Sequence, residues 1–462
     1  MKDLYGESII KKRLTSTQVI LIGFLVAIVI GALLLMLPVA TVKGETTTFG
    51  TALFTSTTSI CVTGLVVVDT FSHWTFIGQL IILVLIQIGG FGVITIYSII
   101  MMALGKRFSL RTRILIQDYY NLDSIKGLIK FLRRVVKGTL FVECLGALAY
   151  MIRFIPQFGV LKGIWTSIFN SISAFCNAGM DVIGSDSLIS YQGDVWINIV
   201  TMTLIILGGL GYVVWFDIVY VIKNVRVKKW PVINIFKKLS EQTKLVLILT
   251  ISFIVVGAVA VFFFEWDNPD TIGNLSLSNK ILACFFQSVT FRTAGFATIP
   301  QDSLNPATCL VGCILMFIGG SPVGTAGGVK TVTIFVIGLN AVAFVRNRNE
   351  NVIFGKRVSY NLINKAAAIV TFSLSLTLLL AIFLIHFEDV SIIDATYEVF
   401  SATATVGLSR ALTPTLHAVG KSLLIIGMYA GRIGTLSMAL FFASSRQDRN
   451  DIKYSKGRFI VG

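Results

Sequence analysis

An eleven-residue polar segment occurs four times in this chain, and it constrains the fold more than any other feature. Residues 54–64 read FTSTTSICVTG, residues 169–179 read FNSISAFCNAG, residues 285–295 read FFQSVTFRTAG and residues 397–407 read YEVFSATATVG. In each copy an aromatic side chain lies ten residues before the final glycine, and the glycines are 115, 116 and 112 residues apart. Near-equal repeats of one unit favour four copies around a common axis.

The apolar content indicates a membrane protein. Of the 462 residues, 55% are hydrophobic and 13% are charged, and the mean hydropathy is +0.83. A soluble fold of this size could not bury so much apolar surface, whereas a bilayer can solvate it. We therefore expect an all-α polytopic membrane protein. It would have four M1–pore helix–M2 repeats, that is, eight transmembrane helices around a central pore with pseudo-fourfold symmetry.

The distribution of positive charge predicts the orientation of the chain. The net charge is +16, and thirty of the 39 lysines and arginines fall in residues 2–13, 106–137, 223–244, 346–365 and 446–458. These stretches alternate with the polar segments, which is typical of the positive-inside rule. We expect a multi-pass membrane protein, with both termini cytoplasmic and the bilayer as its main partner. Nucleic-acid binding is not expected, because the charge does not form one patch.

Each unit is predicted to contain a first span, a short re-entrant pore helix and a last span. In chain order these elements occupy residues 18–37, 49–60 and 74–104; 136–155, 164–175 and 195–222; 244–265, 281–291 and 307–345; and 363–385, 392–403 and 416–443. The cytoplasmic ends would be residues 1–14 and 446–462, and the repeats residues 15–105, 106–223 (with its preceding cytoplasmic loop), 224–345 and 346–445. The N-terminal apolar run is interpreted as a span rather than a signal peptide, since no cleavage site is evident.

Glycine clusters lie in the last span of each unit. Residues 89–92 read GGFG, residues 208–211 read GGLG and residues 431–434 read GRIG. Such clusters let a neighbouring backbone approach closely. In the third unit, residues 319–330 read GGSPVGTAGGVK, and a proline with five glycines cannot remain helical there. Non-helical backbone at membrane depth must be buried in protein or line water.

The third-unit sequence has three interpretations. A phosphate-binding P-loop is disfavoured because Val329 separates Gly328 from Lys330 and no strand pattern precedes it. A simple helix kink is possible, and so is an unwound loop that gates a pore. Arg432, at membrane depth, must face water or a partner. It could donate to a loop carbonyl between helices, or place a positive charge beside an ion path and pair with the third-unit loop.

The polar segments suggest a cation filter made of backbone oxygens. Glycine can take a positive φ, so the carbonyls before it can turn toward a common axis and replace the water around a cation. The alternative is that the serines and threonines only bridge helices. The predicted filter residues, with backbone carbonyls as the ligands of the cation, are Val62, Thr63, Gly64, Asn177, Ala178, Gly179, Thr293, Ala294, Gly295, Thr405, Val406 and Gly407. Arg292, beside them, is expected to point behind the filter toward a carboxylate.

Other ionisable and reactive residues suggest structural roles. Glu143 lies deep in a span and has either a structural partner or a transport role, whereas Arg153 and Asp217 are expected to reach the interface. The six cysteines lack metal or disulfide spacing, so they are interpreted as small apolar residues: Cys61, Cys144, Cys176, Cys284, Cys309 and Cys313.

Together the four repeats, the single filter glycines, the broken third-unit helix and Arg432 resemble the Trk/Ktr/HKT superfamily of cation transporters over residues 15–445. The compact size is most similar to the membrane subunits of Ktr-type bacterial potassium uptake systems. The resemblance implies potassium uptake across the bacterial cytoplasmic membrane, often Na⁺-stimulated, through a homodimer with one pore per subunit. It further implies that K⁺ at the filter carbonyls is the only metal. It also implies a cytosolic ring of nucleotide-binding regulatory subunits, so no cofactor is expected in this chain and the nucleotide would be on the partner.

The resemblance also assigns a gate, formed by the third-unit loop and Arg432. The implied gate residues are Gly319, Gly320, Ser321, Pro322, Gly324, Thr325, Ala326, Gly327, Gly328, Lys330 and Arg432. Val323 departs from the pattern, because a smaller residue is expected at that position. Two alternatives to a K⁺ transporter are a Na⁺-selective or Na⁺-coupled transporter of the same fold and a membrane-embedded enzyme. The enzyme is disfavoured because only His73, His386 and His417 are available, all near predicted span ends.

Overall fold

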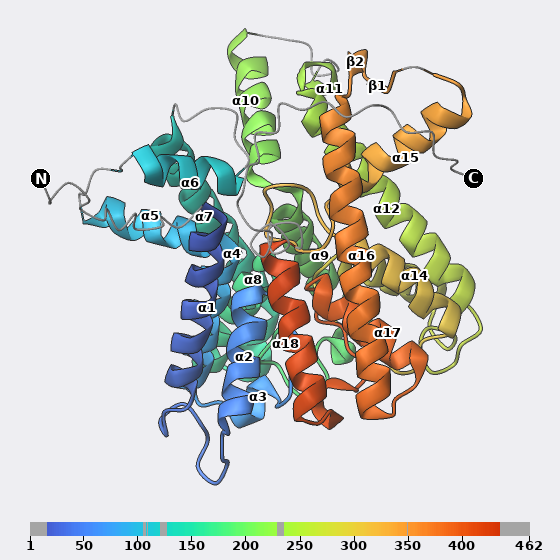
Figure 1. The fold of residues 1–462 in the computed structure, drawn as a ribbon. Helices are drawn as coiled ribbons and strands as arrows, with labels where there is room; N and C mark the ends of the chain where they lie inside the picture. The colour runs from blue at the N-terminus through green and yellow to red at the C-terminus, as the bar shows by residue number, and fades with distance from the viewer. Residues whose placement is uncertain are drawn as a thin grey trace, which may run out of the picture.

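The computed structural model is a bundle of helices, which Figure 1 shows from the side. The structure describes residues 16–104, 108, 110–120, 127–228, 235–348 and 350–434. The predicted termini at residues 1–14 and 446–462, and the end of the last predicted span, lie outside these residues. The chain is an all-α polytopic membrane protein, and its M1, pore and M2 helices recur in the predicted order.

The helices of the first two units bracket the first two polar segments. The first unit contains α1 (Ser16–Leu35), α2 (Phe49–Cys61), α3 (Thr70–His73), α4 (Phe76–Phe91) and α5 (Val93–Ala103). The second contains α6 (Leu110–Tyr120), α7 (Leu128–Phe158), α8 (Val160–Cys176), η1 (Ile189–Tyr191), α9 (Val195–Leu210) and α10 (Tyr212–Lys228). The pore helices α2 and α8 each end one residue after the predicted limit; α2 begins at the predicted residue, and α8 begins four residues before it.

The last two units repeat this order. The third contains α11 (Ile235–Lys238), α12 (Glu241–Glu265), α13 (Leu277–Phe291), α14 (Pro306–Phe317) and α15 (Thr331–Val345). The fourth contains β1 (Val352–Ile353), β2 (Lys356–Arg357), α16 (Tyr360–Glu388), α17 (Ile392–Thr403), η3 (Thr413–Thr415) and α18 (Ala418–Ile433). The antiparallel hairpin β1–β2, which pairs Val352 with Arg357, was not predicted from the sequence.

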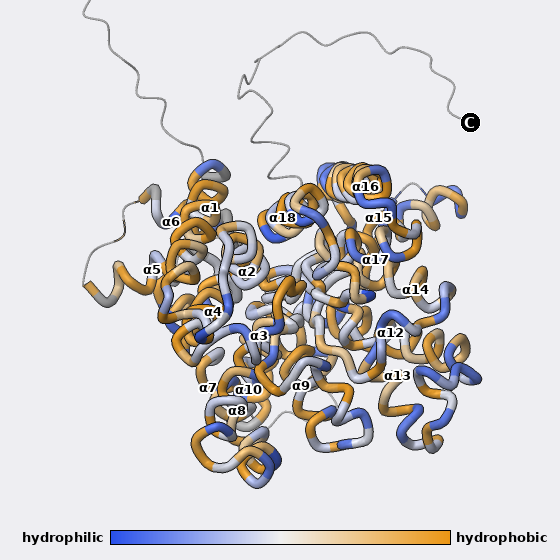
Figure 2. Tube along the Cα trace, turned by 90° about the horizontal axis from the view of Figure 1, so that it is seen from below, coloured by the Kyte–Doolittle hydropathy of each residue, from blue (hydrophilic) through white to orange (hydrophobic). Residues whose placement is uncertain are grey.

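The units pack in a closed cycle. Within each unit the first span packs against the pore helix, in the pairs α1–α2, α7–α8, α12–α13 and α16–α17. Between units the last span packs against the next pore helix, in the pairs α4–α8, α9–α13, α14–α17 and α18–α2. The view along the bundle shows these groups around a common centre (Figure 2). The pseudo-fourfold arrangement therefore follows from contacts between units as well as from the repeats.

The apolar surface points outward. On α1, Phe24 and Ala32 are buried, whereas Leu25, Ile30 and Leu33 are more than half exposed. A helix that is apolar on every side needs a non-aqueous surrounding on its outer face. By length and composition, four described helices (α1, α7, α12 and α16) can each cross a membrane, and two bent helix pairs raise the number to six. The shorter apolar helices α14 and α15 flank the third-unit loop.

The prediction of continuous last spans in the first two units was wrong. Helices α4 and α5 meet at an angle of 99°, and helices α9 and α10 at 98°. The breaks fall at Gly92 and Gly211, whose φ values are +79° and +88°. A residue with positive φ cannot continue a right-handed helix, and glycine adopts that conformation without a steric penalty. Gly434 has the same kind of backbone, with φ +94°, and it ends α18.

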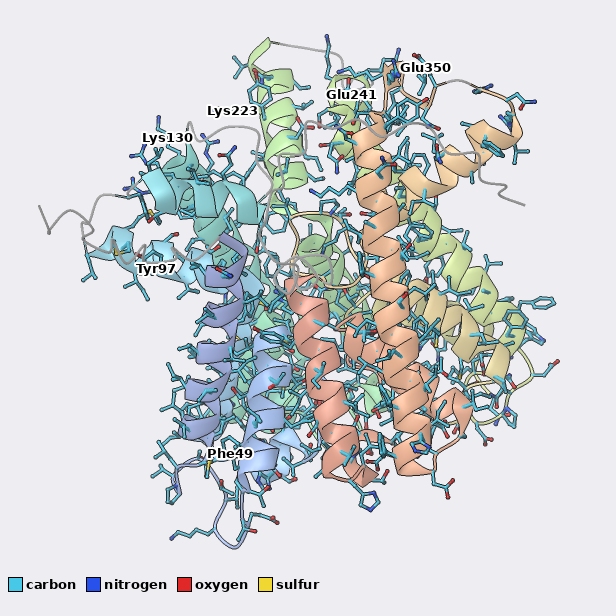
Figure 3. The ribbon with its side chains drawn as sticks, viewed as in Figure 1. Phe49, Tyr97, Lys130, Lys223, Glu241 and Glu350 are labelled. Carbon is cyan, nitrogen blue, oxygen red and sulfur yellow. The ribbon has the colours of Figure 1, made fainter. Side chains whose placement is uncertain are left out.

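One end of the bundle carries lysines and arginines from the basic stretches of the sequence, and we call it the basic end. Lys130, Lys223, Glu241 and Glu350 all lie there, whereas Phe49 lies at the opposite end (Figure 3). Two exposed ion pairs at the basic end join Lys356 to Glu241 at 2.9 Å and Arg357 to Glu350 at 3.0 Å. The position of these residues at one end fits the alternation of basic stretches in the sequence, because each basic stretch lies next to a span.

Candidate functional site

The four repeated glycines form a ring. A β-carbon built on any of them would lie less than 3.0 Å from the carbonyl oxygen before the glycine of the next unit. In chain order, Gly64, Gly179, Gly295 and Gly407 approach the oxygens of Ala178, Ala294, Val406 and Thr63. The last contact returns to the first unit, so the ring is closed. All four glycines also have positive φ, between +66° and +101°.

The residue two positions before each ring glycine has a left-handed backbone conformation. The φ values are +55° at Val62, +61° at Asn177, +71° at Thr293 and +53° at Thr405. This conformation costs a β-branched residue on the order of 1–2 kcal/mol, so the surrounding packing must impose it. In the first two units this residue is the C-cap of the pore helix, and in the last two units it directly follows the C-cap. In the first unit, for example, the N–H of Val62 donates to the Ser59 carbonyl and that of Thr63 to the Thr58 carbonyl. Residue type predicts this conformation only at Asn177, because asparagine adopts it far more often than valine or threonine does.

Hydroxyl groups hold the segments that carry the glycines. The Thr58 hydroxyl accepts from the Gly64 N–H at 2.9 Å, and the Ser401 hydroxyl accepts from the Gly407 N–H at 3.1 Å. In the other units, Ser173 accepts from the Met180 N–H at 3.1 Å, and Thr290 donates to the Phe296 carbonyl at 2.6 Å. These hydrogen bonds fix the backbone on both sides of the ring, because each joins a pore helix to the segment that follows it.

A second set of hydroxyls bridges helices, as the alternative interpretation of the polar segments expected. Ser56, Ser171 and Ser288 donate to carbonyls of the first spans, at Ile28, Glu143 and Ile254. Each serine sits against a glycine of that span, namely Gly31, Gly146 and Gly257. Helix bridging therefore accounts for part of the polar character, but not for the closed ring.

In three units, one glycine of the last span lies against the C-terminal end of a pore helix. A β-carbon on any of these three glycines would lie less than 3.0 Å from a carbonyl oxygen four residues before a ring glycine. The contacts join Gly89 to Ile60, Gly208 to Phe175 and Gly431 to Thr403. The expected close backbone approach is therefore present in three units.

We expect Gly208→Ala to lower the thermal midpoint of the detergent-solubilised protein, because the added methyl overlaps the Phe175 carbonyl. Overpacking of this kind costs about 1–3 kcal/mol. The matched control is Gly338→Ala in α15, where no neighbouring atom lies within 4 Å of the added carbon. That variant should be at least as stable as the parent, since alanine is the better helix former. Equal midpoints for the two variants would contradict the close contact at Gly208.

The third-unit loop is non-helical from residue 318 to residue 330 and is ordered by backbone hydrogen bonds. Its two ends pair with each other, since the N–H of Gly319 donates to Val329 at 3.0 Å and that of Val329 to Phe317 at 3.1 Å. Its middle pairs with the second unit, where Ser321 donates to Gly209 and Thr325 to Gly208. The break is therefore a folded loop, and the interpretation as a simple helix kink was wrong.

Close contacts explain the glycines of this loop. A β-carbon on Gly319 would meet the Gly327 carbonyl, and one on Gly327 would meet the Thr405 hydroxyl, each at less than 3.0 Å. Gly328 has φ +65°. Gly320 would contact Ala326, and Gly324 lies against the Gly208 carbonyl. The Pro322 carbonyl faces Gly211, and the Lys330 ammonium donates to the Ala326 carbonyl at 2.6 Å.

Val323 differs from the smaller residue expected at its position, and the structure gives a physical reason for that expectation. Its φ is +64°, a left-handed conformation that a β-branched side chain adopts only at a cost. The Val323 carbonyl accepts from the Tyr212 N–H at 3.1 Å, directly after the bend at Gly211. The loop and the bend in the second unit therefore hold each other in place.

Two arginines join the loop to other units. The guanidinium of Arg432 donates through Nη1 to the Thr325 carbonyl and through Nη2 to the Gly89 carbonyl. It therefore makes the expected contact with the third-unit loop and a further one with the first unit. The prediction that Arg292 points toward a carboxylate was wrong. Its guanidinium donates to the carbonyls of Thr250, at 3.4 Å, and Gly319, at 3.5 Å, and it forms no ion pair within the described residues.

The buried acid Glu143 has structural partners. Its carboxylate accepts from Gln87 Nε2 at 3.1 Å and contacts the Cys176 thiol. The two charges expected at span ends are also paired, since Arg153 forms a 2.7 Å ion pair with Asp194 and Asp217 accepts from the Ser240 N–H. Five cysteines are buried free thiols, and Cys144 is exposed.

The two sides of the glycine ring have different surroundings. A cavity of about 150 Å³, which we call the mouth, is lined by all four glycines and by residues that follow them. The loop contacts residues that precede the glycines: the Thr325 hydroxyl donates to the Phe175 carbonyl at 3.2 Å, and Gly327 lies against Thr405. The ring therefore separates the mouth from the third-unit loop.

Comparison with known proteins shows which family this chain resembles over most of its length. The TrkH family, described as "Cation transport protein", matches residues 9–452. Ktr system potassium uptake protein B from Bacillus subtilis is 40% identical over 97% of both chains. Potassium/sodium uptake protein NtpJ from Enterococcus hirae is 35% identical over 98% of both chains. The crystal structure of the potassium transporter TrkH from Vibrio parahaemolyticus matches with a TM-score of 0.72 and 15% identity, over 96% of this chain and 87% of the other.

Proposed function

This chain belongs to the TrkH family of cation transport proteins, and from that premise we propose that it takes up potassium ions across a bacterial cytoplasmic membrane. Membership of a transport family excludes the membrane-embedded enzyme considered from the sequence. The names of the Bacillus subtilis and Vibrio alginolyticus relatives, both Ktr system potassium uptake protein B, support potassium as the cargo. The inward movement of one charge gains about 2.3 kcal/mol per 100 mV, so the membrane potential can drive uptake.

The closed ring of glycines is the observation that carries this proposal. Four carbonyl oxygens lie beside the glycines of neighbouring units, at Thr63, Ala178, Ala294 and Val406. In the proposed filter these oxygens and the adjacent backbone oxygens replace water around the ion. The pore helices point their C-terminal ends toward the ring, and the negative end of each helix dipole favours a cation there. The side chains before the glycines can therefore differ between units without loss of the site.

The third-unit loop and Arg432 form the proposed gate. The loop lies on one side of the ring, and Arg432 ties its Thr325 carbonyl to the Gly89 carbonyl of the first unit. A guanidinium beside an ion path repels cations, and its hydrogen bonds hold the loop across that path. Opening would then require these two hydrogen bonds to break or rearrange.

A second candidate function is Na⁺-selective or Na⁺-coupled transport in the same fold. It is favoured by the printed name of the Enterococcus hirae relative, which includes sodium as well as potassium. The presence of Gly64 favours potassium, because a serine at this position would be expected in Na⁺-preferring members. Whether Na⁺ stimulates potassium uptake is tested in the same experiment as the main proposal.

The basic end is the proposed cytoplasmic side, since short cytoplasmic loops carry an excess of lysine and arginine. Both termini would then be cytoplasmic. The word "system" in the relatives' names supports a partner subunit. We place a cytosolic ring of nucleotide-binding regulatory subunits on the basic end and a second copy of this chain beside the first. Regulation by nucleotide would act through that ring rather than through a site in this chain.

Expression of the full chain should restore growth of a bacterial strain that lacks potassium uptake, at limiting external K⁺. The rescue should increase when millimolar Na⁺ is added, if Na⁺ stimulates uptake. Initial rates of K⁺ and Na⁺ uptake in the same cells identify the cargo. Rescue by Na⁺ uptake alone, without K⁺ accumulation, would support the second candidate function. Absence of any cation flux from correctly inserted protein would contradict both.

A further inference from the structure

The mouth carries negative charge in a chain that is strongly basic overall. Two of its lining residues are acidic, Asp69 and Asp181, and the lining described by the structure contains no lysine or arginine. The net charge of the chain is +16, so this local excess of negative charge does not follow from composition. The nearby cation Arg410 is neutralised by Asp394, at 2.6 Å, and also donates to the Gln301 carbonyl.

Both carboxylates are held in place. Asp181 lies two residues after Gly179 and is only 9% exposed, and its Oδ1 accepts from the Ile183 N–H at 3.3 Å. Asp69 accepts from the Ser72 N–H at 2.9 Å and caps α3. The other polar lining residues are uncharged, including Gln301 and Ser409. Fixed charges in a recess surrounded by protein concentrate counter-ions more strongly than the same charges on a flat surface.

We propose that Asp69 and Asp181 collect cations at the mouth, and that the charge of Asp181 sets the apparent affinity for the transported ion. This inference rests on the proposed potassium uptake, and it concerns residues outside the backbone filter. A cation attracted into the mouth is adjacent to the glycine ring, because all four glycines line the same cavity. The mouth therefore acts on capture of the ion, whereas the ring acts on selection between ions.

Capture of cations at the mouth is expected to depend on pH. Burial raises the pKa of the Asp181 carboxyl to about 6; hydrogen bonds from Ser187 and Ile183 oppose the shift, and the charge of Asp69 adds to it. The nearby phenols of Tyr150 and Tyr191 are neutral near pH 7 and add no charge beside Asp181, and Asp186 is exposed to solvent. Asp181 is then charged above pH 6 and becomes neutral as the external pH falls through this value, so acid should weaken capture.

The test measures initial K⁺ uptake by the full chain, with its native partners, in K⁺-depleted cells. External K⁺ is varied at several external pH values between 5.5 and 8. At pH 7.5, Asp181→Asn should raise KM about three- to ten-fold, as expected for loss of one nearby charge, with Vmax changed less than two-fold. In the parent, KM should rise about two- to three-fold between pH 7.5 and 5.5, because most but not all of the Asp181 carboxyls are neutral at pH 5.5. In Asp181→Asn, KM should stay constant.

Two further variants separate charge from structure. Asp181→Glu keeps the charge and should retain most of the affinity and the pH dependence. Asp270→Asn removes an exposed carboxylate from another loop, which does not line the mouth, and should leave KM unchanged. The KM difference between the parent and Asp181→Asn should also shrink at higher ionic strength, since salt screens the attraction.

The outcomes distinguish this inference from the proposed function. If the parent takes up no K⁺, the proposed function is wrong. If the parent takes up K⁺ but Asp181→Asn has the parent's KM and pH profile, the mouth has no collecting role. A fall in Vmax with an unchanged KM would also overturn the inference, because it would assign Asp181 a purely structural role.

Discussion

Replacing Gly64 by serine is expected to lower the preference for K⁺ over Na⁺ by about ten-fold. The backbone at Gly64 has φ +101°, and a side chain there would lie within 3.0 Å of the Ala178 carbonyl. A non-glycine residue with positive φ costs roughly 1–2 kcal/mol, which corresponds to about a ten-fold change in an equilibrium. Relief of this strain must move Gly64 or Ala178, and both belong to the ring. The measurement is the ratio of initial K⁺ and Na⁺ uptake rates into vesicles that contain the purified variant.

Gly44→Ser is the matched control for this substitution. Gly44 also has a positive φ, +97°, but no atom lies within 4 Å of a β-carbon placed there. The control therefore introduces a similar backbone strain without crowding the ring, and it should keep the parent selectivity. If Gly64→Ser retains the parent ratio of K⁺ to Na⁺ uptake, the assignment of the four glycines to a filter is wrong.

Replacing Arg432 by alanine is expected to raise K⁺ flux about ten-fold under conditions in which the parent is mostly closed. The guanidinium donates to the Thr325 and Gly89 carbonyls, and hydrogen bonds from a charged donor contribute about 1.5–3 kcal/mol each. Loss of both would free the loop on the side that faces the first unit. The loop would remain tied to the other units by Thr325 and Arg292, so the variant should still fold. Tracer flux in vesicles at a fixed membrane potential measures the change.

Arg432→Lys separates the positive charge from the two hydrogen bonds. Lysine keeps the charge, but its single nitrogen cannot replace a guanidinium that reaches two carbonyls with separate amino groups. If the hydrogen bonds between the loop and the first unit control the gate, this variant should have the same raised flux as Arg432→Ala. If the charge itself forms the barrier, it should resemble the parent. Parent-like flux in Arg432→Ala would rule out both roles.

The contacts of the loop connect the proposed gate to the proposed filter. Thr325 donates to the Phe175 carbonyl at the end of the second pore helix, and Gly327 lies against Thr405 of the fourth segment. Arg292 belongs to the third segment and donates to Gly319 at the start of the loop. Movement of the loop must therefore change the support of three filter segments. Variants of the loop are expected to affect selectivity as well as flux.

Much of the architecture could be predicted because the bilayer acts on the sequence locally. Residues 392–403 were predicted as the fourth pore helix, and the structure forms α17 over Ile392–Thr403. Long apolar stretches defined the first spans, and a proline among five glycines correctly predicted the unwound third-unit loop. Equal spacing of the four glycines indicated a shared axis, and their contacts close a ring. Each of these features depends on hydrophobicity or on residues that cannot continue a helix.

Other features depended on contacts between distant parts of the chain. The left-handed backbone at Val62, Thr293 and Thr405 is imposed by packing, since these residue types do not favour it. The bends at Gly92 and Gly211 were missed because a glycine within an apolar run is compatible with a continuous span. The carbonyl partners of Arg292 are distant in sequence, so their identity had no local signal.

The sequence by itself determined the number of units, their order and the residues that enter the centre, because a bilayer requires about twenty apolar residues per crossing and polar segments must avoid lipid. Only the tertiary structure decided which unit adjoins which, where the backbone turns left-handed, and which acids meet at the mouth. Those properties arise from contacts between segments more than a hundred residues apart, and a side chain's type does not specify such neighbours.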